Sequence, residues 1–213
     1  MNYDLLMEEE IKRCGVGKSL LLHVCCAPCS SAVLERLGSV FKITIFFYNP
    51  NIDTIDEYNK RLLELEKFIT SFKTKYPVSL ISAEYRSEDF KEMAIGLENE
   101  PERGIRCYQC YKLRLSETAK VAEKNNFDYF TTSLTLSPYK NSKWLNEIGE
   151  ELGKNIETNY LYSDFKKKNG YKRSIELSHE FNLYRQDYCG CIYSRKQREI
   201  MTNKMSNKLE EIA

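Results

Sequence analysis

The sequence is poor in histidine, proline and glycine, and it has no long apolar run. Two of its 213 residues are histidines, which argues against a histidine-rich zinc site. No segment approaches the roughly 20 apolar residues of a membrane-spanning helix. The acidic N-terminus also lacks a stretch typical of a signal peptide. With no proline- or glycine-rich linker either, we expect a single domain over residues 1–213, located in the cytoplasm.

The charge of the chain is close to neutral but unevenly distributed. Lys and Arg number 32 against 31 Asp and Glu, whereas residues 160–213 hold 11 basic and 7 acidic side chains. Tyrosines are interleaved with these basic residues, a pattern that can hold RNA phosphates and stack on bases. A solvated helix face with tyrosines at its edge is the alternative, and composition alone favours it.

Short strand-like runs alternate with amphipathic helical segments. Strands are expected at residues 19–24, 41–47, 78–81, 127–132 and 157–160. Helices are expected at 28–37, 55–75, 84–96 and 107–125, and from Ser137, which precedes a proline, to Leu152. This alternation predicts an α/β fold with a parallel, doubly wound sheet and helices on both faces. Residues 160–213 are expected to form a helical C-terminal extension packed on the active-site end of the sheet.

Eight cysteines are the most informative residues. Because thiols stay reduced in the cytoplasm, this number indicates metal binding or redox chemistry and not a framework of structural disulfides. Three of them follow the first expected strand at the start of a helix, where the helix dipole stabilises thiolates. The cysteines form three groups, Cys25/Cys26/Cys29, Cys107/Cys110 and Cys189/Cys191, with Cys14 alone and taken as incidental.

The first two groups offer up to five thiolates, and four would satisfy either zinc or an iron–sulfur cluster. The loops after the first, second and fourth strands are expected to meet at the carboxyl edge of the sheet. A disulfide between Cys189 and Cys191 would close a small strained ring that is easily reduced, as suits a catalytic couple. Further metal ligation by this pair is the alternative. His23 is interpreted as a core residue and a secondary candidate ligand, and His179 as a surface residue.

Several motifs together resemble the cobalamin-independent epoxyqueuosine reductase family, QueH. They extend from residue 23 to residue 191, which is most of the chain. The matching stretches are 23–29 (HVCCAPC), 48–52 (YNPNI) with Glu57, Tyr58 and Arg61, 102–110 (ERGIRCYQC) with Arg114, 127–132 (FDYFTT), 137–141 (SPYKN), 170–174 (GYKRS) and 183–191 (LYRQDYCGC). Two positions depart from the resemblance. Asp53 stands where the family pattern leads us to expect proline, and Ser133 stands where it leads us to expect threonine.

The resemblance implies a Rossmann-like fold of the HUP or ATP-pyrophosphatase type and the last step of queuosine synthesis. In that step the epoxide of epoxyqueuosine, in the anticodon loop of a tRNA, is reduced to an alkene by two electrons. It also implies an iron–sulfur cluster and a redox-active cysteine pair. An unidentified electron donor is expected to supply the electrons. We expect a [4Fe–4S] cluster on Cys25, Cys26, Cys107 and Cys110. Cys29 is an alternative ligand, or a ligand of a second metal ion, iron or zinc.

The remaining candidates have less specific roles. Cys189 and Cys191 are the expected catalytic couple, and Asp187, Tyr188 and Lys140 are candidate proton donors or positioning residues. The candidate tRNA contacts are Lys140, Arg173, Arg185 and Tyr188. Two other functions stay open: a structural zinc module that binds RNA, and an ATP-pyrophosphatase-like tRNA-modifying enzyme. The second is disfavoured because Cys-Cys-Ala-Pro-Cys stands where a glycine-rich phosphate loop would be needed.

Overall fold

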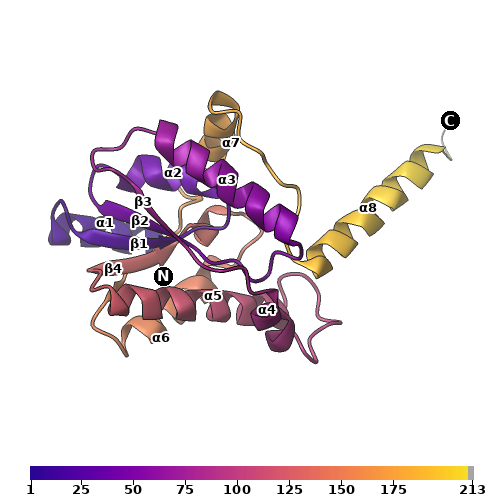
Figure 1. Ribbon diagram of the computed structural model, residues 1–213, viewed down its shortest axis with the longest axis horizontal. Helices are drawn as coiled ribbons and strands as arrows, with labels where there is room; N and C mark the ends of the chain where they lie inside the picture. Colours follow the sequence, from indigo (N-terminus) through magenta and orange to yellow (C-terminus); the bar gives the residue numbers. More distant parts are fainter. Residues whose placement is uncertain (211–213) are drawn as a thin grey trace.

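A five-stranded parallel sheet forms the centre of the molecule (Figure 1). The computed structural model describes residues 1–210, and side chains up to residue 202. The strands are β1 (Ser19–His23), β2 (Lys42–Phe47), β3 (Ser79–Ser82), β4 (Tyr129–Thr132) and β5 (Asn159–Tyr160). Their order is β3-β2-β1-β4-β5, so the chain winds outward from β1 in both directions. This confirms the predicted Rossmann-like α/β fold.

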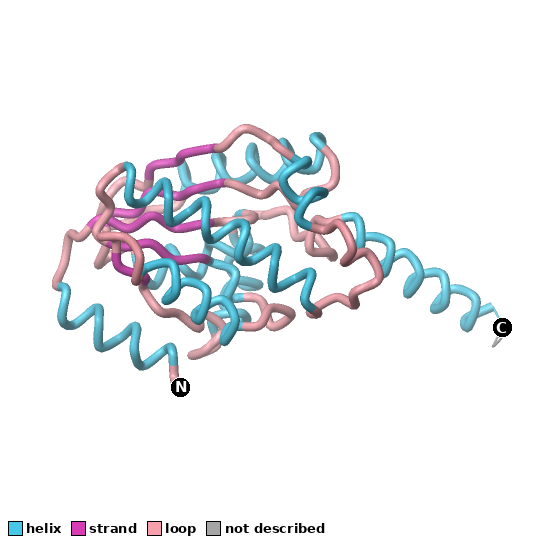
Figure 2. The backbone as a smooth tube through the Cα atoms, turned by 90° about the horizontal axis from the view of Figure 1, so that it is seen from below, coloured by secondary structure: helices cyan, strands magenta, loops and turns pink. Residues whose placement is uncertain are grey.

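Helices cover both faces of the sheet (Figures 1 and 2). One face carries α1 (Tyr3–Cys14), α2 (Ala27–Leu37), α3 (Ile55–Ser71) and α7 (Gly170–Glu180), and the other carries α5 (Ile105–Lys124) and α6 (Ser142–Gly153). A short helix, α4 (Ser87–Met93), lies beside α5. Helices on both faces bury both sides of the strands, which explains why the strands read as near-continuous apolar runs.

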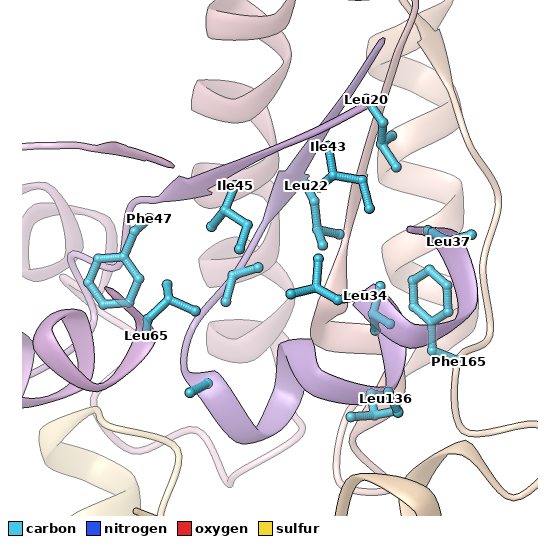
Figure 3. Close-up of a cluster of buried hydrophobic side chains, with 14 of the residues drawn as sticks. Leu20, Leu22, Leu34, Leu37, Ile43, Ile45, Phe47, Leu65, Leu136 and Phe165 are labelled. Carbon is cyan, nitrogen blue, oxygen red and sulfur yellow. The ribbon is translucent and has the colours of Figure 1, made fainter. Parts of the chain in front are cut away.

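The core is divided by the alternation of side chains along each strand. On one face Leu20 and Leu22 of β1 pack with β2 and with Leu34 of α2 (Figure 3). On the other face Leu21 packs with Phe130 and with the alanines of α5. Burial of these side chains holds β1 in register with β2 and β4, because a slip of one residue would exchange the two faces. The carboxyl ends of the three strands therefore deliver their loops to one edge.

One local prediction was wrong in its start, and one helix was not predicted. The helix expected from Ser137 begins later than predicted, because residues 137–140 form a turn in which the hydroxyl of Ser137 accepts from the backbone N–H of Tyr139. A 3-10 turn, η1 (Ser133–Leu136), precedes it, and α6 begins at Ser142, five residues after Ser137, capped by Asn141. Lys140 therefore lies in a loop beyond β4 and not in a helix. The polar N-terminal segment, for which no element was predicted, forms α1.

The C-terminal part consists of one packed helix, a segment that returns to the sheet edge, and one projecting helix. Helix α7 packs against α2, and the segment 181–191 then returns to the carboxyl edge of the sheet. Helix α8 (Ile192–Glu210) begins directly after Cys191 and projects away from the sheet (Figures 1 and 2). Treating residues 160–213 as an extension of a single domain stays a prediction. Among the described helices, none has the length and apolar content needed to cross a bilayer.

Candidate metal and redox centre

Three thiols meet where β1 passes into α2. Cys26 is the N-cap of α2 and Pro28 lies in its first turn, which places Cys29 on the same side as Cys26. The sulfurs of Cys25, Cys26 and Cys29 all lie within 4.8 Å of one another, and those of Cys25 and Cys26 are 3.6 Å apart. Ligand sulfurs around one tetrahedral zinc are about 3.8 Å apart, given Zn–S bonds of about 2.3 Å. The triad is therefore able to bind a metal ion.

The second pair of thiols, at the start of α5, shares an apolar cluster with each of the other groups. Cys107 packs against the apolar cluster that contains Cys25 and Cys26, and its sulfur accepts from the N–H of Arg103 at 3.2 Å. Cys110, one turn further along α5, packs in a cluster with Cys191. Among the described residues, only the sulfurs of Cys25, Cys26 and Cys29 form a group of three within ligand distance of one another, while Cys107 and Cys110 share apolar clusters with the first and the third group.

The Cys189-Gly190-Cys191 segment is anchored by backbone contacts. The N–H of Cys189 donates to the hydroxyl of Ser194 at 3.1 Å, and the N–H of Ser194 approaches the sulfur of Cys191 at 3.4 Å. The carbonyl of Gly190 accepts from the N–H of Asp53 at 3.0 Å. Proline, which the resemblance led us to expect at position 53, has no N–H and could not make this bond.

Two cations without a carboxylate partner among the described residues lie beside the thiols. Arg114, 1% exposed, donates from Nη2 to Asn49 at 2.5 Å and from Nε to the ring of His23 at 3.3 Å. The ammonium of Lys140 is 3.5 Å from the sulfur of Cys189. A buried cation is costly unless an anion balances it, so this arrangement calls for thiolates or another anionic group at the site.

The thiol pKa values follow from these neighbours. Hydrogen bonds from Cys26 and Cys29, with the charges of Arg114 and Lys140, hold the pKa of Cys25 well below its usual range. A hydrogen bond from Cys191, again with Lys140 and Arg114, does the same for the pKa of Cys189. Burial instead raises the pKa of Cys26 to about 12. The lowered pKa values of Cys25 and Cys189 favour, in the first and third groups, the thiolate, which is the form that binds metal or attacks an electrophile.

Several predicted site residues lie near this centre. Tyr188 places its ring 5.6 Å from the guanidinium of Arg61 and its hydroxyl 3.5 Å from the carboxylate of Asp53. Lys140 contacts Cys189, as described above. His23 is fully buried, both of its ring nitrogens have partners, and burial lowers its pKa to about 3. It is therefore a neutral core residue that orients Arg114.

Other predicted residues lie elsewhere or are engaged by the chain itself. Asp187 is exposed and accepts from Arg198 at 3.0 Å. Arg173 pairs with Glu35 and Glu176 on the α2–α7 side of the molecule. Arg185 donates to the carbonyl of Ser174 and the hydroxyl of Ser178. Cys14 lies at the opposite edge of the sheet, near the beginning of β4, and His179 is exposed.

The roles of Ser194 and Arg61 were not predicted from the sequence. Ser194 carries no signal, because its contact with Cys189 depends on how α8 begins. Arg61 does carry one: it shares the inward face of α3 with Tyr58, Leu65 and Phe68. A charged residue on an otherwise apolar helix face indicates a buried polar contact.

Cysteines and buried cations at the carboxyl edge of a Rossmann-like sheet define a thiol-based metal or redox protein of the α/β class. The family model described as "Epoxyqueuosine reductase QueH" matches residues 20–197. The chain belongs to the epoxyqueuosine reductase QueH family.

Curated relatives with that name support the assignment over most of the chain. One from Streptococcus pyogenes serotype M1 is 44% identical, over 94% of this chain and 80% of its own. One from Staphylococcus epidermidis is 42% identical (94% and 87%), and one from Thermotoga maritima 31% (89% and 97%). Among solved structures, a predicted tRNA methyltransferase subunit from Methanocaldococcus jannaschii matches with a TM-score of 0.45 and 15% identity, over 76% of this chain and 75% of that chain.

Proposed function

We propose that this chain reduces epoxyqueuosine in tRNA to queuosine. The observation that carries the proposal is the convergence of three thiol groups, from residues 25–29, 107–110 and 189–191, around Lys140 and Arg114. Membership of a family whose curated members are named epoxyqueuosine reductase supports the choice of substrate.

The proposed reaction fits the chemistry of a thiol pair. Removing an epoxide oxygen as water leaves an alkene and consumes two electrons and two protons. The Cys189/Cys191 pair can supply both electrons, since one S–S bond forms as the two C–O bonds break. One proton comes from the Cys191 thiol and the other from the Lys140 ammonium beside the Cys189 thiolate. An external electron donor must then return the disulfide to the dithiol.

The donor set at the site fits an iron–sulfur cluster, because it consists of thiols alone. We propose that Cys25, Cys26, Cys107 and Cys110 hold a [4Fe–4S] cluster. Cys29, which lies with the first two, is the alternative ligand or part of a second site for iron or zinc. When bound, such a cluster supplies electrons one at a time. The cationic side chains of Arg114 and Lys140 would offset the negative charge of four thiolates.

The chain's own residues account for the remaining steps. Lys140 is the favoured proton donor, because its ammonium already contacts Cys189 and can protonate an oxygen that leaves beside that sulfur. Tyr188 lies on the same loop as the thiol pair and can position the substrate. The other two candidates, Arg173 and Arg185, contact their own chain and would bind tRNA phosphate with their outward atoms.

Anaerobic incubation with tRNA that carries epoxyqueuosine and a strong reductant tests the proposal. Nucleoside mass spectrometry should show conversion to queuosine by the metal-loaded chain. The Cys14→Ser variant should convert it as well, because Cys14 lies far from the site, whereas Cys189→Ser should not. Absence of conversion by the loaded wild-type chain would contradict the proposal and favour a zinc module that binds RNA.

A further inference from the structure

Arg61 is a buried guanidinium with one unused donor. It is 1% exposed on α3, its Nε donates to Glu57 at 2.7 Å, and its Nη1 donates to the carbonyl of Cys189 at 3.3 Å. Its Nη2 is buried and has no hydrogen-bond partner among the described residues. A buried donor on a charged group without an acceptor is destabilising, so this atom indicates an acceptor that protein atoms do not supply.

The position of the guanidinium is fixed from both sides. Thr54 caps α3 by accepting from the backbone N–H of Glu57, and the hydroxyl of Tyr184 donates to the Glu57 carboxylate at 3.4 Å. These two contacts fix the position of Glu57, whose carboxylate binds Arg61. On the other side Gly190 packs so closely that a Cβ there would lie 3.1 Å from Nη1. Arg61 therefore has little freedom to turn away from the cysteine loop.

The anionic partner of this guanidinium is the Glu57 carboxylate, and the charge of the guanidinium also acts on the thiols of the first group. Cys26 and Cys25 both interact with its charge, and Cys26 does so more strongly. The backbone of Cys189 is bound to the same side chain. Arg61 thus contacts the Cys189-Gly190-Cys191 loop directly and acts on the first cysteine group through its charge, although residues 26 and 189 are far apart in the sequence.

We propose that Arg61 is a positioning residue that holds the Cys189-Gly190-Cys191 loop against the first cysteine group and donates its free Nη2 hydrogen bond to a sulfur of the metal–thiolate centre formed there. The second part rests on the proposed function. Hydrogen bonds to cluster sulfurs raise the reduction potential, because they stabilise the added negative charge. The planar fork is essential to this role: lysine keeps the charge but cannot contact Glu57, Cys189 and a sulfur at once.

The experiment compares wild type, Arg61→Lys and a matched control, Arg36→Lys, which changes a partly buried arginine paired with Asp4 and Glu8 away from the site. Each full chain is reconstituted anaerobically with iron and sulfide, and its metal content and midpoint potential are measured. R61K should load metal and be reduced about tenfold less favourably, a downward shift of about 59 mV for one electron. R36K should match the wild type. If the midpoint potential of R61K equals that of the wild type, the proposal that Arg61 donates a hydrogen bond to the centre is overturned.

The metal-free chain tests the positioning role independently of any cluster. Alkylation of Cys189 by iodoacetamide, located by peptide mass spectrometry on folded protein, should be several-fold faster in R61K than in wild type and R36K. Equal rates in all three overturn the positioning role. If R61K fails to load metal, the alkylation rates alone decide whether Arg61 positions the cysteine loop. If the wild type itself takes up no iron and sulfide, the proposed cofactor fails, while the alkylation rates still test Arg61.

Discussion

Adding a single methyl group at Gly190 should lower activity strongly while the chain still folds. The backbone φ of this residue is +113°, a region that side chains other than glycine rarely adopt, and enforcing it costs on the order of 1–3 kcal/mol. A Cβ at this position would also lie 3.1 Å from Nη1 of Arg61 and 3.2 Å from Cγ1 of Ile52. Because Arg61 is tied to Glu57 at 2.7 Å, the loop and not the arginine must move.

The magnitude of the effect follows from this geometry. Displacement of a reacting group by about 1 Å typically costs about a hundredfold in rate. We therefore expect Gly190→Ala to lower kcat/KM for epoxyqueuosine in tRNA by about a hundredfold. The melting temperature should fall by several degrees, given about 2–4 °C per kcal/mol for a chain of this size.

Gly96→Ala is the matched control for the Gly190 substitution. Gly96 has φ +78°, and a Cβ there would meet nothing within 4 Å, so this substitution imposes backbone strain without a clash. It should lower the melting temperature to a similar extent and leave kcat/KM within about twofold of wild type. Wild-type kcat/KM for G190A, or an equal loss of kcat/KM in G96A, would refute the reasoning.

Two further predictions concern charged groups. Lys140→Met removes the ammonium 3.5 Å from the Cys189 sulfur; it should lower kcat by about tenfold or more at unchanged iron content, and an unchanged kcat would exclude proton donation by Lys140. The Asp128 carboxylate accepts from Lys18 and Ser19, and its pKa is lowered to about 2, mainly by Lys18. Because this folded-state pKa lies below the unfolded value of 3.8, the stabilisation is complete above about pH 4 and is lost as the pH falls through about 2. Asp128→Asn should lower the free energy of unfolding by about 1 kcal/mol at pH 7, a difference that disappears near pH 2 in urea titrations; a pH-independent difference would contradict this.

The sheet could be predicted from the sequence because both of its faces are buried. The runs that became β1, β2 and β4 are apolar enough to stand out, and their alternation with amphipathic helices leaves few other folds. The start of α6 was missed because a serine before a proline serves a turn as well as a helix cap. Ser137 makes the turn, and Asn141, which can accept in the same way, caps the helix.

The chemistry of the site was visible in the sequence, but its geometry was not. The grouping of the cysteines predicted the three segments that meet, because each group follows a strand or begins a helix. Which thiols lie closest depends on the first turn of α2, which places Cys29 with Cys25 and Cys26. The contact between Arg61 and Cys189 spans 128 residues, and no local pattern encodes a contact at that separation.

The central claim is that remote thiols form one electron-carrying centre, and metal analysis tests it most directly. Wild type, Cys25→Ser, Cys110→Ser and Cys14→Ser are reconstituted anaerobically, and iron, zinc and sulfide per chain are measured. The account predicts about four iron and four sulfide per chain in wild type and C14S, with a large loss in C25S and C110S. Stoichiometric zinc without iron in a chain that still converts epoxyqueuosine fully would contradict it.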